Sequence, residues 1–210
     1  MLHAPNVGPN ANLSDYQRRR RLLLTIGVAI GCAFLIFANS AQNELMHERI
    51  EGGGLALILI GIGGRLWATL YIGGRKSSDI VQIGPYSMMR NPLYFFSTIA
   101  AAGLGAQLGS YWMALAFAVA CWAAFMVVTR REEAFLAQKF GQPYLDYMAR
   151  TPRFFPNPWL YRDDEQVLFT PRLLWKTLRD GSVFIAAMLA FELIEVLQEA
   201  GVLPVLFRLS

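Results

Sequence analysis

Long apolar runs separated by short polar segments constrain the fold of this chain more than any other feature. Hydrophobic residues make up 55% of the 210 residues, and they are gathered into runs long enough for membrane helices. The runs are Leu22–Ala38, Gly53–Ile72, Leu93–Leu108, Tyr111–Thr129 and Ser182–Leu206. They predict an all-α fold: a polytopic membrane helix bundle with four core transmembrane helices and a fifth, carboxy-terminal apolar helix.

The charged segments divide the chain into three parts. Residues 1–21 form a basic tail that ends in Arg18–Arg21, residues 22–156 form the membrane core, and residues 157–210 form an interfacial and membrane-associated extension. A basic segment before an apolar run is also typical of a signal peptide, and Ala38-Asn39-Ser40 would suit cleavage. The run that follows Arg21 is long for a signal peptide, which favours an uncleaved first helix.

The distribution of basic residues predicts the orientation in the membrane. Lys and Arg are concentrated in Arg18–Arg21 and in segments 73–91 and 130–180, whereas the loop 39–52 is weakly acidic. Because basic loops stay in the cytoplasm, both long polar segments should face the cytosol. The chain is expected to be a protein of the bacterial inner membrane. Gly109-Ser110 leaves room only for a tight hairpin, which holds these two segments at the same membrane face.

Cysteines, histidines and net charge argue against several kinds of site. Cys32 and Cys121 each lie inside an apolar run and are interpreted as buried small hydrophobes. His3 and His47 are the two histidines of the chain and belong to no Cys/His cluster, so no metal site is predicted. The net charge of +4 is modest, and its position beside apolar runs indicates membrane lipids as partners and no nucleic acid.

A polar, turn-rich segment separates the second and third apolar runs. It reads Gly84-Pro85-Tyr86-Ser87-Met88-Met89-Arg90-Asn91-Pro92-Leu93-Tyr94. Pro92 suits the first turn of a helix, whose free N–H groups would lie beside Arg90 and Asn91. That arrangement favours binding of a carboxylate or phosphate. The alternative is a capped membrane re-entry in which Arg90 reaches lipid phosphates.

A second polar segment follows the fourth apolar run. It contains Arg130-Arg131-Glu132-Glu133, then Phe140-Gly141-Gln142-Pro143-Tyr144-Leu145-Asp146-Tyr147, and ends at Pro152-Arg153-Phe154-Phe155-Pro156. Together the two segments resemble the integral-membrane methyltransferases, a superfamily that includes isoprenylcysteine carboxyl methyltransferases and phospholipid N-methyltransferases. The resemblance covers roughly residues 52–156. Asn91 stands where many members carry His.

The resemblance implies S-adenosylmethionine (SAM) as the cofactor and a lipophilic substrate that enters from the bilayer. Arg90 is expected near the SAM carboxylate, and Glu132 or Glu133 near its ammonium or ribose, with the choice between the two acids left open. The expected cofactor-binding residues are Gly84, Pro85, Tyr86, Arg90, Asn91, Pro92, Tyr94, Glu132, Tyr144 and Tyr147. The expected catalytic residues are Arg130, Arg131, Glu132 and Glu133.

These residue types suit distinct roles. Arg130 or Arg131 would hold an anionic substrate head by a bidentate contact, and Glu133 would accept the proton of an amine substrate. The tyrosines would border the adenine or lie over the sulfonium, with interfacial anchoring as the alternative for each. Arg65 is a charge inside the second apolar run. It is either an anchor for an anionic group or the partner of a carboxylate within the bundle.

The carboxy-terminal extension lies beyond the resemblance. Residues 157–180 are expected to form an interfacial helix, followed by the apolar helix Ser182–Leu206. Glu192, Glu195 and Glu199 are spaced to share one helical face. That face should turn to the bundle, to a partner subunit or to water.

Several functions stay open from the sequence. The methyl acceptor could be an isoprenylcysteine-type carboxylate, an amino phospholipid or a small thiol. A sterol-type reductase that uses NADPH is a different enzyme class, although such enzymes are generally longer. A non-catalytic scaffold or a homo-oligomer could assemble through glycine-rich faces such as Gly27/Gly31 and Gly105/Gly109.

Overall fold

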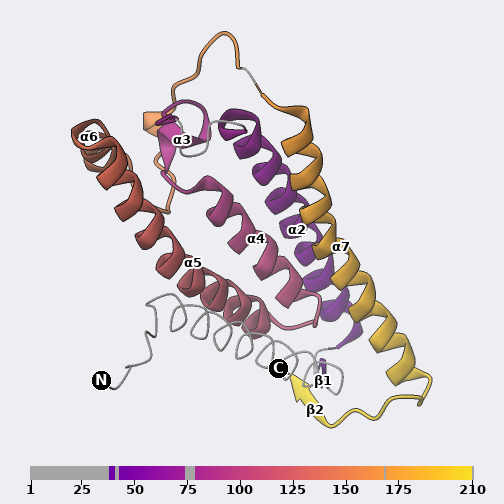
Figure 1. Cartoon of the computed structure of the whole chain (residues 1–210). Helices are drawn as coiled ribbons and strands as arrows, with labels where there is room; N and C mark the ends of the chain where they lie inside the picture. Colours follow the sequence, from indigo (N-terminus) through magenta and orange to yellow (C-terminus); the bar gives the residue numbers. More distant parts are fainter. Residues whose placement is uncertain (1–37, 41–42, 74–78, 168, 210) are drawn as a thin grey trace, which may run out of the picture.

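The computed structural model describes residues 38–40, 43–73, 79–167 and 169–209, which form a helix bundle (Figure 1). Its helices are α2 (Glu44–Ile72), α3 (Pro85–Met88), α4 (Pro92–Ala106), α5 (Tyr111–Phe140), α6 (Gln142–Arg150), the 3-10 helix η1 (Pro158–Leu160) and α7 (Pro171–Glu199). The all-α prediction is confirmed for this bundle. One addition is a parallel pair of short strands, β1 (Ala38–Ser40) and β2 (Phe207–Leu209).

Within the described residues, α2 and α5 are the two helices long and apolar enough to cross a membrane. They have 29 and 30 residues, and at about 1.5 Å per residue each exceeds a hydrocarbon layer of roughly 30 Å. α4 has 15 residues and is shorter than a full span. The predicted first span, Leu22–Ala38, lies outside the described residues except for Ala38 in β1. The number of spans therefore stays a prediction.

The predicted hairpin is formed by α4 and α5. α4 begins at Pro92, as expected, and α5 begins after Ser110, whose side chain accepts a hydrogen bond from the Met113 amide. Between them Gly109 adopts a φ of 63°, a left-handed conformation that favours glycine. α4 packs between α2 and α5 (Figure 1). Both polar segments consequently come to the same end of the bundle.

α5 forms an outer wall of the bundle. Its buried residues are Thr129 and Glu133, both near its carboxy-terminal end. In its apolar half, Trp112, Leu115 and Val119 are each more than half exposed. Among the described residues no segment covers this apolar face, and a face of this length on a helix able to cross a membrane is a surface for lipid.

Glycines allow α2 and α4 to approach closely. A Cβ added at Gly61 would lie 2.6 Å from the Ala100 Cβ, and one added at Gly103 would lie 2.5 Å from the carbonyl oxygen of Gly54. Gly63 faces open space, with nothing within 4 Å of an added Cβ. Gly54, Gly61 and Gly64 of the second apolar run thus serve packing within the chain, while assembly through glycine faces stays a prediction.

Gly61→Val should destabilise the bundle far more than Gly63→Val. The valine at position 61 has to displace the backbone of α4, and overpacking of this kind typically costs about 1–3 kcal/mol. Position 63 accepts a side chain without a clash, so its change in unfolding free energy should stay within about 0.5 kcal/mol. Thermal unfolding of both variants in the same detergent measures the difference. Equal effects would mean that α2 and α4 are not in close contact.

The helices of the carboxy-terminal extension differ from those predicted. The expected interfacial helix over 157–180 and the separate helix over Ser182–Leu206 are wrong, because α7 runs unbroken from Pro171 to Glu199. Gly181 does not end the helix, since it is buried against α2 with an added Cβ 3.3 Å from Ile62. Packing of this kind outweighs the low helix propensity of glycine. The chain turns at Gly201, whose φ is 71°.

The segment before α7 crosses the end of the bundle and fixes the first polar motif. The Tyr71 and Tyr161 hydroxyls both donate to Asp163 Oδ2, at 2.8 and 2.7 Å. The amide of Gly84 donates to the carbonyl of Arg162 at 2.7 Å. Residues 157–170 therefore hold the loop that leads into α3 and α4.

Candidate active site

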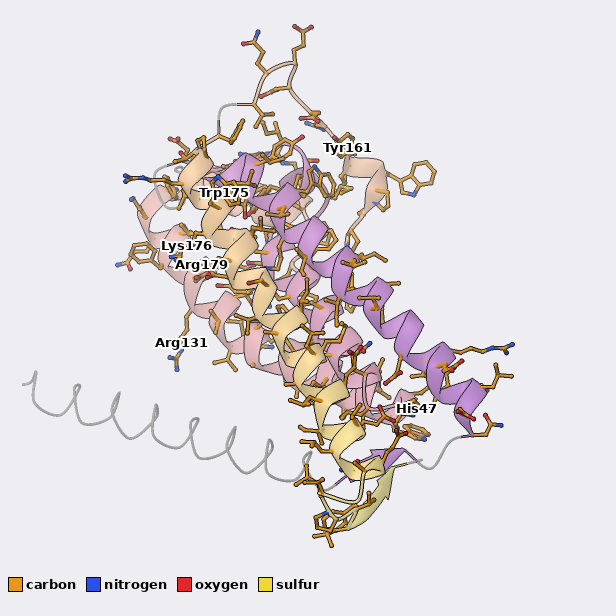
Figure 2. The ribbon with its side chains drawn as sticks, turned by 90° about the vertical axis from the view of Figure 1, so that its right-hand side faces the viewer. His47, Arg131, Tyr161, Trp175, Lys176 and Arg179 are labelled. Carbon is orange, nitrogen blue, oxygen red and sulfur yellow. The ribbon has the colours of Figure 1, made fainter. Side chains whose placement is uncertain are left out.

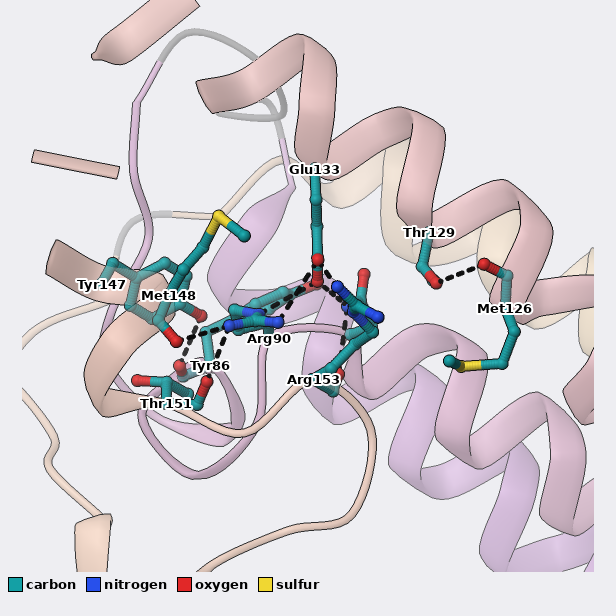
Figure 3. A network of polar contacts seen from close by, with 10 residues as sticks. Tyr86, Arg90, Met126, Thr129, Glu133, Tyr147, Met148, Thr151 and Arg153 are labelled. Atoms are coloured by element: carbon teal, nitrogen blue, oxygen red, sulfur yellow. Dashed lines mark hydrogen bonds and ion pairs between the residues drawn. The ribbon is translucent and has the colours of Figure 1, made fainter. Parts of the chain in front are cut away.

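A buried carboxylate joins the two polar motifs. Glu133 of α5 is 3% exposed and points toward the start of α4 (Figure 3). Arg90 donates from Nε to its Oε1 at 3.0 Å and from Nη2 to its Oε2 at 3.3 Å. Asn91 Nδ2 donates to Oε1 at 2.9 Å, and Arg153 Nε donates to Oε2 at 2.9 Å. Each oxygen of Glu133 therefore accepts two hydrogen bonds from the protein.

The guanidinium of Arg90 is likewise held by hydrogen bonds to protein acceptors. Its Nη1 donates to the carbonyls of Met148 at 2.6 Å and Thr151 at 3.1 Å, so all three guanidinium nitrogens have protein acceptors. Its backbone amide donates to the carbonyl of Pro152 at 2.9 Å. With 8% of its side chain exposed, Arg90 ties the first motif to the end of α6 and the turn that follows.

The cluster of Arg90, Asn91, Glu133 and Arg153 carries two positive charges and one negative charge. Charge-assisted hydrogen bonds of this kind are stronger than neutral ones. Breaking a buried ion pair by removing one partner is strongly destabilising, because the other charge is left uncompensated. Asn91 also donates to the carbonyl of Arg153 at 3.0 Å, so its amide orients the cluster; it makes no side-chain cap of α4.

The neighbouring acid, Glu132, has a different environment. It is half-buried and accepts a hydrogen bond from the Tyr94 hydroxyl at 2.9 Å. The Tyr94 ring packs on Phe125, with ring centroids 4.6 Å apart. Successive residues on a helix point about 100° apart, which is why one acid enters the cluster and the other lies at its edge.

A cavity of about 730 Å³ lies beside the cluster, within the size range of small-molecule sites. Its wall includes residues of α2, α4, α5, α6 and α7. The predicted site residues in this wall are Tyr86, Arg90, Asn91, Pro92, Tyr94, Arg131, Glu132, Glu133 and Tyr144. The structure thus brings the two motifs to one cavity, and the roles assigned to these residues stay predictions.

The tyrosines at the cavity are neutral hydrogen-bonding groups. Burial, together with the negative charge of Glu133, raises the pKa of Tyr144 to about 12. Burial also raises the pKa of Tyr86 well above its ordinary value, and its hydroxyl has no hydrogen-bond partner among the described residues. Both phenols therefore stay protonated at neutral pH.

Four predicted residues do not line the cavity: Gly84, Pro85, Arg130 and Tyr147. Gly84 precedes α3 with a φ of 57°, and an added Cβ would lie 2.3 Å from the Tyr71 ring. The Tyr147 hydroxyl donates to the carbonyl of Tyr86 at 2.7 Å. Gly84 and Tyr147 shape the wall from behind, whereas Arg130 is exposed on α5.

The cavity wall also includes residues that lie outside the two sequence motifs. Lys176, Thr177 and Asp180 of α7 line it, and the hydroxyls of Thr177 and Thr69 lie 2.9 Å apart. In the sequence these α7 residues have the spacing of an ordinary solvated helix face, so no local signal singles them out. Arg65 was noted as a charge in an apolar run, and it does line the cavity.

Comparison with known proteins decides the family. Residues 53–143 match the family model described as Phospholipid methyltransferase. The nickel-cobalt-cadmium resistance protein NccN of Alcaligenes xylosoxydans xylosoxydans is 35% identical over 202 residues, which cover 95% of this chain and 94% of the relative. The chain belongs to the phospholipid methyltransferase family.

Two further members of the phospholipid methyltransferase family are similar to this chain. The cobalt-zinc-cadmium resistance protein CzcN of Cupriavidus metallidurans is 32% identical over 214 residues, covering 97% of this chain and 95% of the relative. Protein-S-isoprenylcysteine O-methyltransferase B of Arabidopsis thaliana is 31% identical over 121 residues, covering 52% of this chain and 61% of the relative. No solved structure matches the chain.

Membership of the phospholipid methyltransferase family agrees with the helices described above. The chain is an integral membrane protein of a family that includes SAM-dependent methyltransferases. The matched region, residues 53–143, contains α4, α5 and nearly all of the cavity-lining residues of the two motifs. α7 lies outside it.

Proposed function

We propose that the chain transfers a methyl group from SAM to a lipophilic substrate at the cytoplasmic membrane face. The observation that carries this proposal is the meeting of both motifs at one cavity, with Glu132 and Tyr94 at its wall. The positive-inside distribution of Lys and Arg supports the cytoplasmic location. A bacterial inner membrane is the expected compartment.

The chemistry of the cavity wall fits SAM. Glu132 offers a carboxylate for an ammonium group, and Arg131 and Lys176 offer cations for a carboxylate. Tyr94 and Phe125 offer flat aromatic surface for an adenine or a sulfonium. Arg90 and Glu133 fit less directly than the sequence predicts, because their polar atoms are engaged with each other and with the backbone.

Methyl transfer is an in-line displacement that asks the protein for positioning more than for covalent help. Bound SAM would supply the electrophilic methyl group. The cluster around Glu133 keeps the ends of α4, α5 and α6 together, so that Glu132 and Tyr94 hold a fixed geometry. When a carboxylate or thiolate attacks a sulfonium, charge is cancelled, and a cavity that excludes water favours that step.

The direct test combines binding and turnover. Purified protein in detergent is titrated with SAM and, separately, with NADPH, which distinguishes a methyltransferase from a sterol-type reductase and from a scaffold. Labelled SAM is then offered with three acceptors: an S-prenylated N-acetylcysteine, phosphatidylethanolamine vesicles and a small alkyl thiol. SAM binding with transfer to the prenylated carboxylate is expected. Absence of SAM binding by folded protein would overturn the proposal.

The substrate is proposed to carry an anionic group that Arg65 receives. Arg65 lines the cavity from the α2 side, and one of its Nη atoms donates to Ser97 Oγ. Its Nε is buried and has no hydrogen-bond partner among the described residues. An anionic group of a ligand in the cavity would pair with this guanidinium, in a wall that also holds the carboxylate of Asp180. A substrate carboxylate or lipid phosphate would meet this guanidinium, whereas an uncharged thiol would not; the three-acceptor assay decides between the two anions.

Arg65→Ala should raise the KM for the carboxylate acceptor by about 10- to 100-fold, because one charge-assisted hydrogen bond is worth about 1.5–3 kcal/mol. SAM affinity should stay within about twofold of the parent. Arg49→Ala is the matched control, since Arg49 is exposed on the same helix and does not line the cavity. A KM that does not change in Arg65→Ala would assign Arg65 to the fold alone, and an equal loss of SAM affinity would assign it to the cofactor.

The names of two relatives add a physiological context. NccN and CzcN align with nearly the whole chain and are named for resistance to divalent metals. We therefore propose that methyl transfer by this chain contributes to growth in the presence of such metals. In a strain that lacks the gene, the parent sequence should restore growth at raised nickel, cobalt or cadmium, whereas Glu132→Gln, whose SAM binding is expected to be weakened, should restore it less. Equal rescue by both would separate metal resistance from the reaction.

A further inference from the structure

One histidine and two glutamates, residue types that can ligate a metal, meet where α2 and α7 pack together, far from the two sequence motifs. His47 and Glu51 are one helical turn apart on α2, and Glu195 reaches them from α7. His47 Nε2 lies 3.1 Å from Glu51 Oε1 and 3.1 Å from Glu195 Oε1. One donor atom from each residue lies within 4.8 Å of the other two. Their convergence comes from tertiary packing, which is why the sequence predicted no metal site.

The nitrogen at the centre of this group is buried. His47 Nε2 has no hydrogen-bond partner among the described residues, although two carboxylate oxygens lie close to it. These two short contacts gather one imidazole nitrogen and two carboxylate oxygens around one point. The side chains of Glu51 and Glu195 are 25% and 29% exposed, which leaves room for water beside them.

We propose that His47, Glu51 and Glu195 bind one divalent transition-metal cation. With ligand distances of about 2.0–2.2 Å, donor atoms in a tetrahedral or octahedral site lie roughly 2.8–3.6 Å apart, and both distances from His47 Nε2 fall in that range. A neutral imidazole with two carboxylates balances the charge of a divalent ion. Imidazole nitrogen favours zinc, cobalt and nickel over magnesium and calcium.

The site is separate from the cavity of the proposed reaction. In Figure 2, His47 lies at the end of the bundle opposite Trp175, while Arg131, Lys176 and Arg179 lie toward the other side. On α2, Glu51 is 14 residues from the cavity-lining Arg65, a distance of about 21 Å along the helix. The metal site therefore does not depend on the proposed function, and each can fail without the other.

The experiment uses full-length protein purified with an affinity tag that contains no histidine, because the natural chain has only two. After treatment with a chelator, equilibrium dialysis against Zn²⁺ or Co²⁺ measures the stoichiometry, and the visible absorption of Co²⁺ reports its coordination. One ion per chain is expected. His47→Ala should weaken binding by at least about 100-fold, and Glu51→Gln and Glu195→Gln by at least about tenfold each.

Two control variants separate this site from adventitious binding. Glu48→Gln removes an exposed acid next to His47, and His3→Ala removes the other histidine; both should bind like the parent. A parent protein that binds no ion at about 1 mM metal would overturn the proposal and leave the three residues as an ion-pair clamp between α2 and α7. Unchanged affinity in folded His47→Ala would also overturn it.

Discussion

Glu133→Gln is expected to destabilise the protein by about 3 kcal/mol. The neutral amide would leave Arg90 and Arg153 in contact without a counter-charge, and such losses in buried ion pairs typically cost 3–5 kcal/mol. The lower end applies here, because the Arg153 side chain is 33% exposed and partly solvated. Thermal unfolding in detergent would report the change.

Glu132→Gln is the control for this measurement. It makes the same chemical change one residue earlier, at a half-buried position that receives the Tyr94 hydroxyl. Its midpoint of unfolding should stay close to that of the parent. If the two variants unfold at the same temperature, the cluster around Glu133 does not hold the motifs together.

Glu132→Gln should instead weaken SAM binding by roughly tenfold to a hundredfold while the protein remains folded. In the proposed function, the carboxylate at the cavity wall would lose a charge-assisted hydrogen bond to the ammonium of SAM, worth about 1.5–3 kcal/mol. Tyr94→Phe should have a smaller effect, since it removes only the hydrogen bond that orients Glu132. Titration calorimetry in detergent measures both.

Arg130→Ala is the matched control for this binding experiment, because Arg130 is exposed and does not line the cavity. It should bind SAM like the parent. Parent-like SAM affinity in folded Glu132→Gln would remove Glu132 from the cofactor site. Arg131 and Lys176, the cations at the same wall, would then be the residues to substitute next.

The sequence was sufficient to place the two motifs together. A tight turn around Gly109 and Ser110 requires α4 and α5 to run antiparallel, and Pro92 marks the start of α4. The sequence could not predict which of Glu132 and Glu133 enters the buried cluster and which lies at its edge. That assignment depends on the rotation of α5 about its own axis relative to α4, which is set by side-chain packing and not by local preference.

The carboxy-terminal extension is a part of the fold that the sequence did not predict correctly. Charged residues up to Asp180 and the pair Gly181-Ser182 look like the end of one helix and the start of another. In the folded chain they lie in the middle of α7, because Gly181 packs on Ile62. Long-range contact of this kind leaves no trace in local periodicity. For the same reason, the sequence does not reveal that Lys176 and Asp180 line the cavity.

The uncovered face of α5 has a consequence for how the enzyme would be assayed. Since Trp112, Leu115 and Val119 are exposed on the helix that also carries Glu132 and Glu133, the lipid layer would hold the cavity end of the bundle at a fixed depth. In the proposed reaction a lipophilic substrate would arrive by diffusion in two dimensions, and its effective concentration would be its mole fraction in the bilayer. Adding inert phospholipid at constant total substrate should slow turnover by surface dilution, whereas adding buffer should not.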